Sequence, residues 1–307
     1  MNKIKNLQGE IIENAPLGGE SWFRCGGSAD LLFKPADTGD LAEFLNQWPV
    51  KQPLTIIGGL ANTIIRDGGI RGATVQLGKN FADVQVLDER YILAGCGTLN
   101  GNIAAAAVKA GIGGLEFLSG IPGSLGGALA MNAGAYGSEM KDVLVGINAL
   151  NRSGLHRRLT PDDLKMTYRH TETPEELIFI SAILKGVAED YDTVKARITE
   201  IKKRRNETQP IKESTGGSTF ANPSPEALRK AGLPEDTRAW QIVEKVGGRG
   251  LMIGGAQMSE KHCNFMINTG TATAHDLETL GDEIRARAAH DLGLTLHWEI
   301  KRVGEKA

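Results

Sequence analysis

Two clusters of glycine constrain this chain more than any other feature of its sequence. The longer cluster, residues 120–127, reads Gly-Ile-Pro-Gly-Ser-Leu-Gly-Gly and is followed by a second glycine-containing run at residues 132–137. The shorter cluster, residues 58–63, follows a strand-like run at residues 54–57. Because glycine lacks a Cβ atom, consecutive backbone N–H groups can face one phosphate. The clusters therefore predict turns that hold a nucleotide, with hydroxyl and amide side chains adding uncharged donors.

An ordinary turn remains an alternative for the shorter glycine cluster, whereas the P-loop and Rossmann patterns are excluded. The shorter cluster alone is also what an ordinary turn after a strand looks like. No P-loop pattern occurs anywhere in the chain. Residues 95–101 approach the Rossmann fingerprint, but the last glycine comes one position late, so we interpret this segment as a turn into a helix.

Composition excludes several classes of function. The formal net charge of −2 gives no basic surface for nucleic acid. No uncharged apolar stretch reaches membrane-spanning length. The cysteines are odd in number and lack CxxC spacing, so they predict buried thiols and no metal site. We expect a cytoplasmic monomer that acts on small molecules, without a nucleic-acid or membrane partner.

Hydrophobic periodicity predicts a mixed chain of the α+β class. Helices are expected at residues 39–48 with Thr38 as the cap, at 100–110, at 191–206 and at 274–292. Strands are expected at 143–150 and 155–159 as a hairpin, at 177–187, and at 294–303 as the last element. We place a domain boundary between residues 190 and 191, and divide residues 1–190 into two subdomains near residues 75–80.

Several motifs occur in an order that resembles the UDP-N-acetylenolpyruvoylglucosamine reductase family. They are GGLANTIIRDGGIRG, GLEFLSGIPGSLGGALAMNAGAYG, YRH and GSTFANP, and residues 22–30 resemble the start of the family's FAD domain. The likeness extends from about residue 16 to 304. It implies a two-subdomain FAD-binding fold of the vanillyl-alcohol-oxidase (PCMH) type at residues 1–190, and a substrate-binding domain at 191–307.

The resemblance also implies cofactors and a reaction. FAD would be bound non-covalently and NADPH would be the reducing co-substrate of an enolpyruvyl ether. Combined with the glycine clusters, it assigns the FAD contacts to Gly58, Gly59, Leu60, Ala61, Asn62, Thr63, Gly120, Ile121, Pro122, Gly123, Ser124, Gly126, Gly127, Asn132, Gly134 and Ala135.

Three polar residues match the family's catalytic positions. Arg169 would hold the substrate carboxylate through its planar fork of donors, which lysine cannot supply. Glu299 would stabilise the enolate if it is protonated, or would orient Arg169 or a water. Ser218 would donate a proton to the substrate carbon. Taken singly, each is also a common surface residue.

The resemblance places substrate contacts at Tyr168, Asn222 and His262. His262 is as readily a satisfied core or surface histidine. The basic run at residues 202–205 is interpreted as a solvated helix face, with contact to the substrate diphosphate as the lesser alternative.

Two positions depart from the family pattern, and two rival functions remain. Ala61 replaces a usual serine, which removes one hydroxyl donor, and Ala221 replaces a frequent lysine. The short stretch between Arg169 and Ser218 resembles the branch without an extra tyrosine-bearing loop. The rivals are a flavin oxidase of the same fold and a nucleotide-binding regulatory module. No histidine precedes His156, which argues against histidyl attachment of the flavin.

Overall fold

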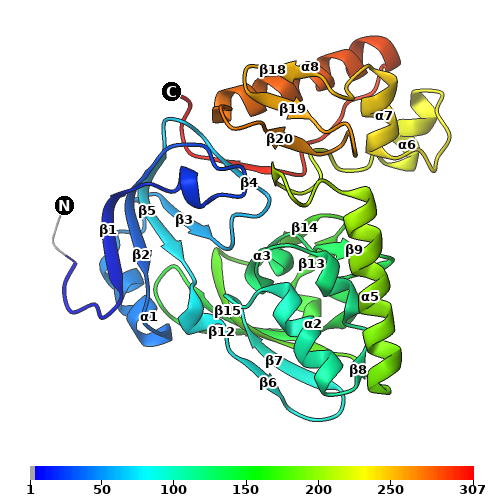
Figure 1. The fold of residues 1–307 in the computed structure, drawn as a ribbon. Coiled ribbons are helices and arrows are strands. Elements are labelled where there is room, and N and C mark those ends of the chain that lie inside the picture. The colour runs from blue at the N-terminus through cyan, green and yellow to red at the C-terminus, as the bar shows by residue number, and fades with distance from the viewer. Residues whose placement is uncertain (1–3) are drawn as a thin grey trace. The chain divides into compact units, whose positions relative to one another are not determined.

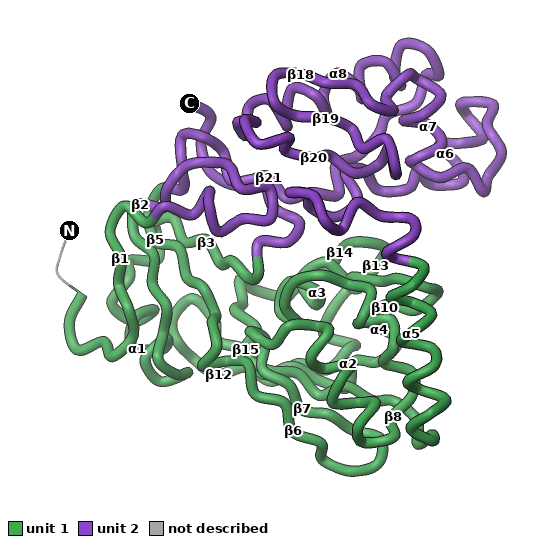
Figure 2. Tube along the Cα trace, in the orientation of Figure 1, with its two compact units in different colours: residues 1–15, 30–59, 71–204 green, residues 16–29, 60–70, 205–307 purple. Residues whose placement is uncertain are grey.

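The computed structural model describes residues 4–307, which divide into two compact units (Figure 2). Unit 1 contains the described residues up to Ala15, together with Asp30–Gly59 and Arg71–Arg204. Unit 2 contains Pro16–Ala29, Leu60–Ile70 and Arg205–Ala307. The predicted limit between residues 190 and 191 differs from this division, because unit 1 continues to Arg204 and unit 2 includes two earlier segments of the chain. The predicted domain limits stay a prediction.

The first sheet of unit 1 has four strands in the order β1-β2-β5-β3 (Figure 1). They are β1 (Glu10–Ala15), β2 (Ala29–Lys34), β5 (Ile70–Gln76) and β3 (Leu54–Ile57), and β3 runs parallel to β5. Helix α1 (Thr38–Gln47) packs beside them, and Phe44 stacks on Phe33 of β2 with ring centroids 4.5 Å apart. Strand β3 ends at Ile57, directly before the shorter glycine cluster.

The second sheet of unit 1 is antiparallel, in the order β12-β11-β15-β7-β6. Its strands are β12 (His156–Leu159), β11 (Leu144–Asn151), β15 (Leu177–Lys185), β7 (Tyr91–Gly95) and β6 (Val84–Val86). Alternate residues of β15 are buried, as expected of a strand with one face on the core.

Helices of unit 1 complete a single apolar core. They are α2 (Asn100–Lys109), α3 (Leu125–Ala130), α4 (Met140–Val143) and α5 (Tyr191–Thr208), which crosses into unit 2 after Arg204. Val194 and Ile198 of α5 are buried in the same cluster as Ile103 and Ala107 of α2. The 3₁₀ segment Glu116–Gly120 and three two-stranded pairs fill the remaining connections: β8 (Ile112–Gly113) with β16 (Val187–Ala188), β9 (Gly134–Ala135) with β10 (Ser138–Glu139), and β13 (Lys165–Thr167) with β14 (His170–Glu172).

Unit 2 has its own core between a small sheet and three helices. The sheet has the order β17-β20-β19-β18, formed by β17 (Ser214–Thr215), β20 (Met266–Asn268), β19 (Ala256–Met258) and β18 (Met252–Ile253). The helices are α6 (Pro225–Lys230), α7 (Ala239–Lys245) and α8 (Ala274–Leu292). Strand β4 (Thr63–Ile65) pairs in parallel with β21 (Lys301–Val303), which joins residues 60–70 to the C-terminal part of the chain.

Most predicted elements are present, with corrections at their ends. Helix α8 has the predicted bounds, because a Thr273 capping box begins it and Gly293 ends it in the left-handed conformation. Helix α1 is capped by Asp37 instead of Thr38, since the Asp37 side chain accepts the N–H of Asp40. The last strand is shorter than predicted, because only Lys301–Val303 finds a partner strand.

Among the helices of the described residues, none combines the length and the apolar character needed to cross a lipid bilayer.

Candidate functional site

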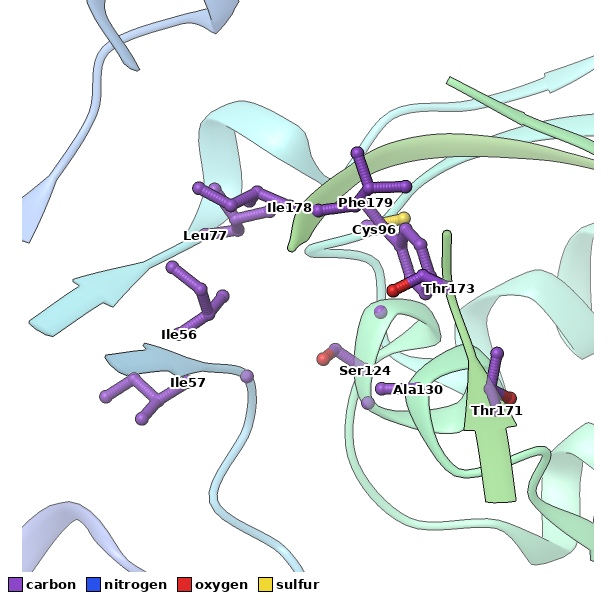
Figure 3. Close-up of a pocket in the computed structure, with 14 residues that line it drawn as sticks. Ile56, Ile57, Leu77, Cys96, Ser124, Ala130, Thr171, Thr173, Ile178 and Phe179 are labelled. Atoms are coloured by element: carbon purple, nitrogen blue, oxygen red, sulfur yellow. The ribbon is translucent and has the colours of Figure 1, made fainter. Parts of the chain in front are cut away.

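A cavity of about 230 Å³ lies within unit 1, where the two glycine clusters meet (Figure 3). Its lining includes the end of β3, the start of α3 and the start of β15. The lining residues are Ile56, Ile57, Gly58, Leu77, Cys96, Ser124, Gly126, Gly127, Ala130, Thr171, Thr173, Leu177, Ile178 and Phe179. Pockets for whole drug-sized ligands span about 300–1,000 Å³, so this cavity can take only part of a dinucleotide.

The longer glycine cluster is held to the turn before α2 by three backbone hydrogen bonds, two of which form the β-bridge between Leu99 and Ser124. The N–H of Asn100 donates to Gly123, that of Leu125 to Thr98 and that of Gly126 to Cys96. Gly123 has a φ of +88°, a conformation that favours glycine. The predicted turn at residues 95–101 is therefore the support of the longer cluster.

The two clusters approach each other so closely that a side chain would not fit between them. A Cβ atom at Gly58 would lie 2.5 Å from the Ser124 Oγ, and one at Gly59 would lie 3.3 Å from the Gly123 Cα. The packing of the two clusters against each other therefore accounts for the missing side chains at Gly58 and Gly59, and Gly58 and Ser124 also line the cavity.

Ser124 supplies a donor that has no partner. It is 5% exposed, and its Oγ makes no hydrogen bond in the described structure. Figure 3 shows this hydroxyl pointing toward Ile57, across the cavity. Leaving a buried hydroxyl unsatisfied costs about 1–3 kcal/mol. A neutral donor beside glycine backbone, between the apolar side chains of Ile57 and Phe179, fits part of FAD.

Of the predicted FAD residues, Gly58, Ser124, Gly126 and Gly127 line this cavity. Asn132 is engaged elsewhere, because its Nδ2 donates to Glu139 and to the Thr167 carbonyl and its Oδ1 accepts the N–H of Lys141. Gly134 and Ala135 form β9. The role predicted for these residues and for residues 120–123 stays a prediction.

Leu60, Ala61, Asn62 and Thr63 belong to unit 2, where Thr63 begins β4. Leu60 and Ala61 are buried, and Leu60 has a φ of +49°. The Asn62 Oδ1 accepts the N–H of Gly217 at 3.2 Å, and its Nδ2 donates to the Glu299 carbonyl at 3.4 Å. The Asn62 amide is thus bonded within unit 2, and a role at the cofactor stays a prediction.

Sequence reasoning missed the wall formed by Thr171, Thr173 and the start of β15. The available signal was that apolar residues occupy both faces of β15: Leu177 and Phe179 alternate with Ile178 and Ile180, which are buried in the core. An apolar side chain that leaves the alternating core pattern often faces a ligand or a partner.

Arg169 occupies the second position of the two-residue turn between β13 and β14. Its φ is +56°, a left-handed conformation that costs a residue with a Cβ of order 1–3 kcal/mol and is frequent at functional sites. The guanidinium donates to the Gly134 carbonyl at 3.0 Å and lies 4.9 Å from the centre of the Tyr168 ring. The turn thus presents a half-buried cation beside an exposed aromatic ring.

Ser218 and Glu299 are brought together in unit 2, although 80 residues of chain lie between them. The N–H of Glu299 donates to the Thr219 carbonyl at 2.8 Å, and Phe220 forms a β-bridge with Trp298. Both Ser218 and Glu299 are half-buried. The structure therefore places the predicted proton donor and carboxyl group on neighbouring segments.

The predicted substrate contacts fall into different settings. Tyr168 is 48% exposed. The Asn222 Oδ1 accepts the N–H of Ala239 and holds the start of α7. Burial lowers the pKa of His262, which packs against Phe265 and whose Nδ1 accepts the N–H of Asn264. His262 is therefore neutral near pH 7, and both of its predicted roles remain open.

Two family models match the chain. Residues 29–160 match the FAD binding domain, and residues 209–303 match the C-terminal domain of UDP-N-acetylenolpyruvoylglucosamine reductase. The predicted fold class, an FAD-binding fold followed by an α+β substrate domain, is confirmed by these matches.

Curated relatives cover nearly the whole chain. UDP-N-acetylenolpyruvoylglucosamine reductase of Maricaulis maris is 47% identical over 98% of this chain and 94% of its own length. The enzyme of Gluconobacter oxydans is 46% identical over 99% of this chain and 95% of its own length.

Solved structures share the fold. The MurB reductase of Thermus caldophilus superposes with a TM-score of 0.78 at 27% identity, covering 97% of this chain and 100% of that one. The 6-hydroxy-D-nicotine oxidase of Arthrobacter nicotinovorans has a TM-score of 0.56 at 12% identity, covering 96% and 88%, which shows a shared fold alone. From its sequence, its two domains and its fold, the chain belongs to the UDP-N-acetylenolpyruvoylglucosamine reductase family of FAD-dependent oxidoreductases in peptidoglycan precursor synthesis.

Proposed function

We propose that this enzyme reduces the enolpyruvyl ether of UDP-N-acetylglucosamine to the lactyl ether, UDP-N-acetylmuramate, with NADPH as the reductant. The observation that supports the proposal is the cavity of unit 1, where glycine backbone and an unpartnered Ser124 hydroxyl form a neutral cradle. Such a cradle suits a flavin nucleotide, and family membership supplies the substrate class.

FAD would be held by Gly58, Ser124, Gly126 and Gly127. The hydroxyls of Thr171 and Thr173 donate to the carbonyls of Leu129 and Glu175, so toward a ligand they can act only as acceptors. When bound, FAD supplies hydride chemistry between NADPH and the alkene. Attachment is proposed to be non-covalent. Cys96, the thiol in the lining, has its pKa raised by complete burial and is therefore a poor nucleophile.

Arg169 is proposed to bind the substrate carboxylate. Its guanidinium offers several N–H donors in one plane, which matches the two oxygens of a carboxylate. Addition of hydride to the terminal alkene carbon moves negative charge toward that carboxylate, as an enolate. A cation fixed in a strained turn loses little entropy when it stabilises this charge.

Ser218 is proposed to donate the proton to the second alkene carbon, which completes the lactyl ether and leaves a serine alkoxide that solvent reprotonates. Glu299, on the neighbouring segment, is proposed to stabilise the enolate as the protonated acid. In its ionised form it would instead orient Arg169 or a water. Removal of one such preorganised group typically costs about 3–4 kcal/mol of the barrier.

We also propose that the enzyme works as a monomer in the cytoplasm. The three thiols, at Cys25, Cys96 and Cys263, are free, as expected in a reducing compartment.

The test is an anaerobic titration of the purified protein, followed by flavin absorbance near 450 nm. NADPH is added first and is expected to bleach the flavin. The enolpyruvyl sugar is added next and is expected to restore the absorbance. Bleaching that only air reverses would indicate an oxidase instead, and a protein without flavin would contradict the cofactor assignment.

A further inference from the structure

The segment that carries Ser218 is anchored on its C-terminal side by one buried side chain. Asn264 accepts the N–H of Thr219 through its main-chain carbonyl at 2.7 Å, and the N–H of Phe220 through its Oδ1 at 3.0 Å. Its Nδ2 donates to the Phe220 carbonyl at 2.9 Å. Asn264 is 5% exposed, so these bonds fix residues 219–220 to the core of unit 2.

On the N-terminal side of Ser218, the anchor is Asn62. The Asn62 Oδ1 accepts the N–H of Gly217 at 3.2 Å, and the Nδ2 donates to the main-chain carbonyl of Glu299 at 3.4 Å. The main-chain carbonyl of Asn62 accepts the N–H of Lys301 at 3.0 Å. One short amide side chain thus connects the residue before Ser218 to Glu299.

Gly217 leaves room for this amide. A Cβ atom at Gly217 would lie 3.1 Å from the Asn62 Oδ1 and 3.2 Å from its Cγ. The φ of Gly217 is not in the left-handed region, so the absence of a side chain reflects the space that Asn62 takes and not the backbone conformation. The two residues are fitted to each other.

Asparagine suits this position for a chemical reason. The bridge needs an acceptor for the Gly217 N–H and a donor for the Glu299 carbonyl on adjacent atoms of one short side chain. Aspartate retains the acceptor and loses the donor, and alanine loses both.

We propose that Asn62 is a positioning residue that fixes the Ser218 hydroxyl relative to Glu299 for the protonation of the substrate carbon. The inference rests on the proposed function of Ser218 and Glu299. It gives Asn62 a task other than the cofactor contact that its glycine-rich context predicts. Proton transfer needs heavy atoms about 2.6–3.2 Å apart, and a displacement of about 1 Å can lower a rate roughly 100-fold.

The first arm of the test measures the contact itself. Asn62→Ala and Asn62→Asp are compared with the wild type by hydrogen–deuterium exchange of the peptide that contains residues 214–220. The Gly217 amide is expected to exchange faster in Asn62→Ala and to stay protected in Asn62→Asp. Asn148→Ala is the matched control, because it removes an amide that bonds to Ser181 in unit 1. Unchanged protection in Asn62→Ala would overturn the inference whatever the substrate.

The second arm separates the two half-reactions. Asn62→Ala is expected to bind FAD normally and to be bleached by NADPH at the wild-type rate. Its reoxidation by the enolpyruvyl sugar is expected to be roughly 10- to 100-fold slower, with a larger solvent deuterium isotope effect, because proton transfer becomes limiting. Asn62→Asp is expected to lie in between.

The third arm is a double-mutant cycle with Gly217→Ala, whose new methyl group would displace Asn62. Gly217→Ala is expected to slow flavin reoxidation by the enolpyruvyl sugar. This slowing is expected to be much smaller in the Asn62→Ala background, since the amide that the methyl group displaces is already absent there. Strictly additive losses would overturn the inference. Loss of FAD from Asn62→Ala, with normal reoxidation of the flavin-loaded fraction, would do so as well.

If the wild-type flavin is never reoxidised by the enolpyruvyl sugar, the proposed function fails and the positioning role fails with it. The exchange arm then still reports whether the contact exists, so the two failures are told apart.

Discussion

Replacement of Gly281 by alanine tests how Trp298 supports Glu299. Gly281 lies in the interior of α8, and an added Cβ would overlap Trp298 Cη2 and Cζ2 and lie 2.9 Å from Cζ3. The indole is held by three contacts. Its Nε1 donates to Asp282 at 3.2 Å, its ring centroid lies 5.4 Å from that of Phe220, and the Arg302 guanidinium lies 4.6 Å from it. The new methyl group at position 281 therefore forces the indole to shift. Because Trp298 directly precedes Glu299, this shift also moves the backbone that carries Glu299.

The expected magnitude follows from two opposing effects. Alanine is favoured over glycine in a helix interior by about 1 kcal/mol. Overpacking of a tight contact costs about 1–3 kcal/mol. Gly281→Ala should therefore lower the free energy of unfolding by up to about 2 kcal/mol. It should also lower kcat roughly 10-fold, because displacement of Trp298 moves Glu299.

Gly101→Ala is the matched control, since Gly101 lies in α2 with nothing within 4 Å of the added Cβ. It should raise stability by up to about 1 kcal/mol and leave kcat unchanged. Urea unfolding followed by circular dichroism measures stability, and turnover at saturating substrate measures kcat. In the Gly281→Ala background, the second substitution Trp298→Phe should recover part of the lost free energy of unfolding and part of the lost kcat. The reasoning is refuted if Gly281→Ala is as stable as Gly101→Ala and has wild-type kcat.

Three further predictions concern single side chains. Ser124→Ala should raise the stability of the flavin-free protein by up to about 3 kcal/mol, because it removes a buried hydroxyl that has no partner there, and should weaken FAD binding about 10-fold in a fluorescence titration; equal affinity would contradict a donor role. Burial lowers the pKa of His262, so the unfolded state binds the proton more readily, and stability is fully present above about pH 6.5 and falls as pH decreases below it. Urea midpoints between pH 5 and 8 should show this decline, and His262→Phe should remove its share of it. Burial also raises the pKa of Cys96 and Cys263, which are buried as predicted, so a disulfide reagent at pH 8 should label them only after unfolding; rapid labelling of either in the folded protein would contradict that burial. Cys25 is only half-buried, contrary to the prediction, but its pKa is raised to about 12, so it should be labelled slowly in the folded protein.

Local chemistry made part of the fold predictable. Helix α8 could be placed because Thr273 is a typical N-cap residue and Gly293 a typical C-cap residue, so both ends are marked in the sequence. The cap of α1 could not, because Asp37 and Thr38 are both good caps, and the choice depends on which side chain reaches the Asp40 N–H. Helix α3 was missed because Gly126 and Gly127 are poor helix formers. A Cβ at Gly126 would lie 3.1 Å from the Cys96 carbonyl, so close packing outweighs helix propensity there.

The glycine clusters pointed to four residues that line the cavity, Gly58, Ser124, Gly126 and Gly127, but not to its other wall or to the contacts between distant segments. Motifs place Ser218 and Glu299 far apart in sequence, and their adjacency depends on the Glu299 N–H reaching the Thr219 carbonyl. Asn62 fits a phosphate-binding turn by its context, and only the folded chain shows its amide bonded to Gly217. Long-range hydrogen bonds of this kind leave no periodic signal in a sequence.

The pairing of β4 with β21 has a consequence for synthesis of the chain. Thr63 and Lys301 are register partners, so β4 has no partner strand until synthesis has reached β21. At about 5–20 residues per second, that delay is roughly 10–50 s. Ile64 and Ile65, which end at 1% and 0% exposure, stay without their final cover for that time. Contacts of such high contact order form slowly, so the nascent protein is most vulnerable to aggregation, and most in need of a chaperone, until β21 leaves the ribosome.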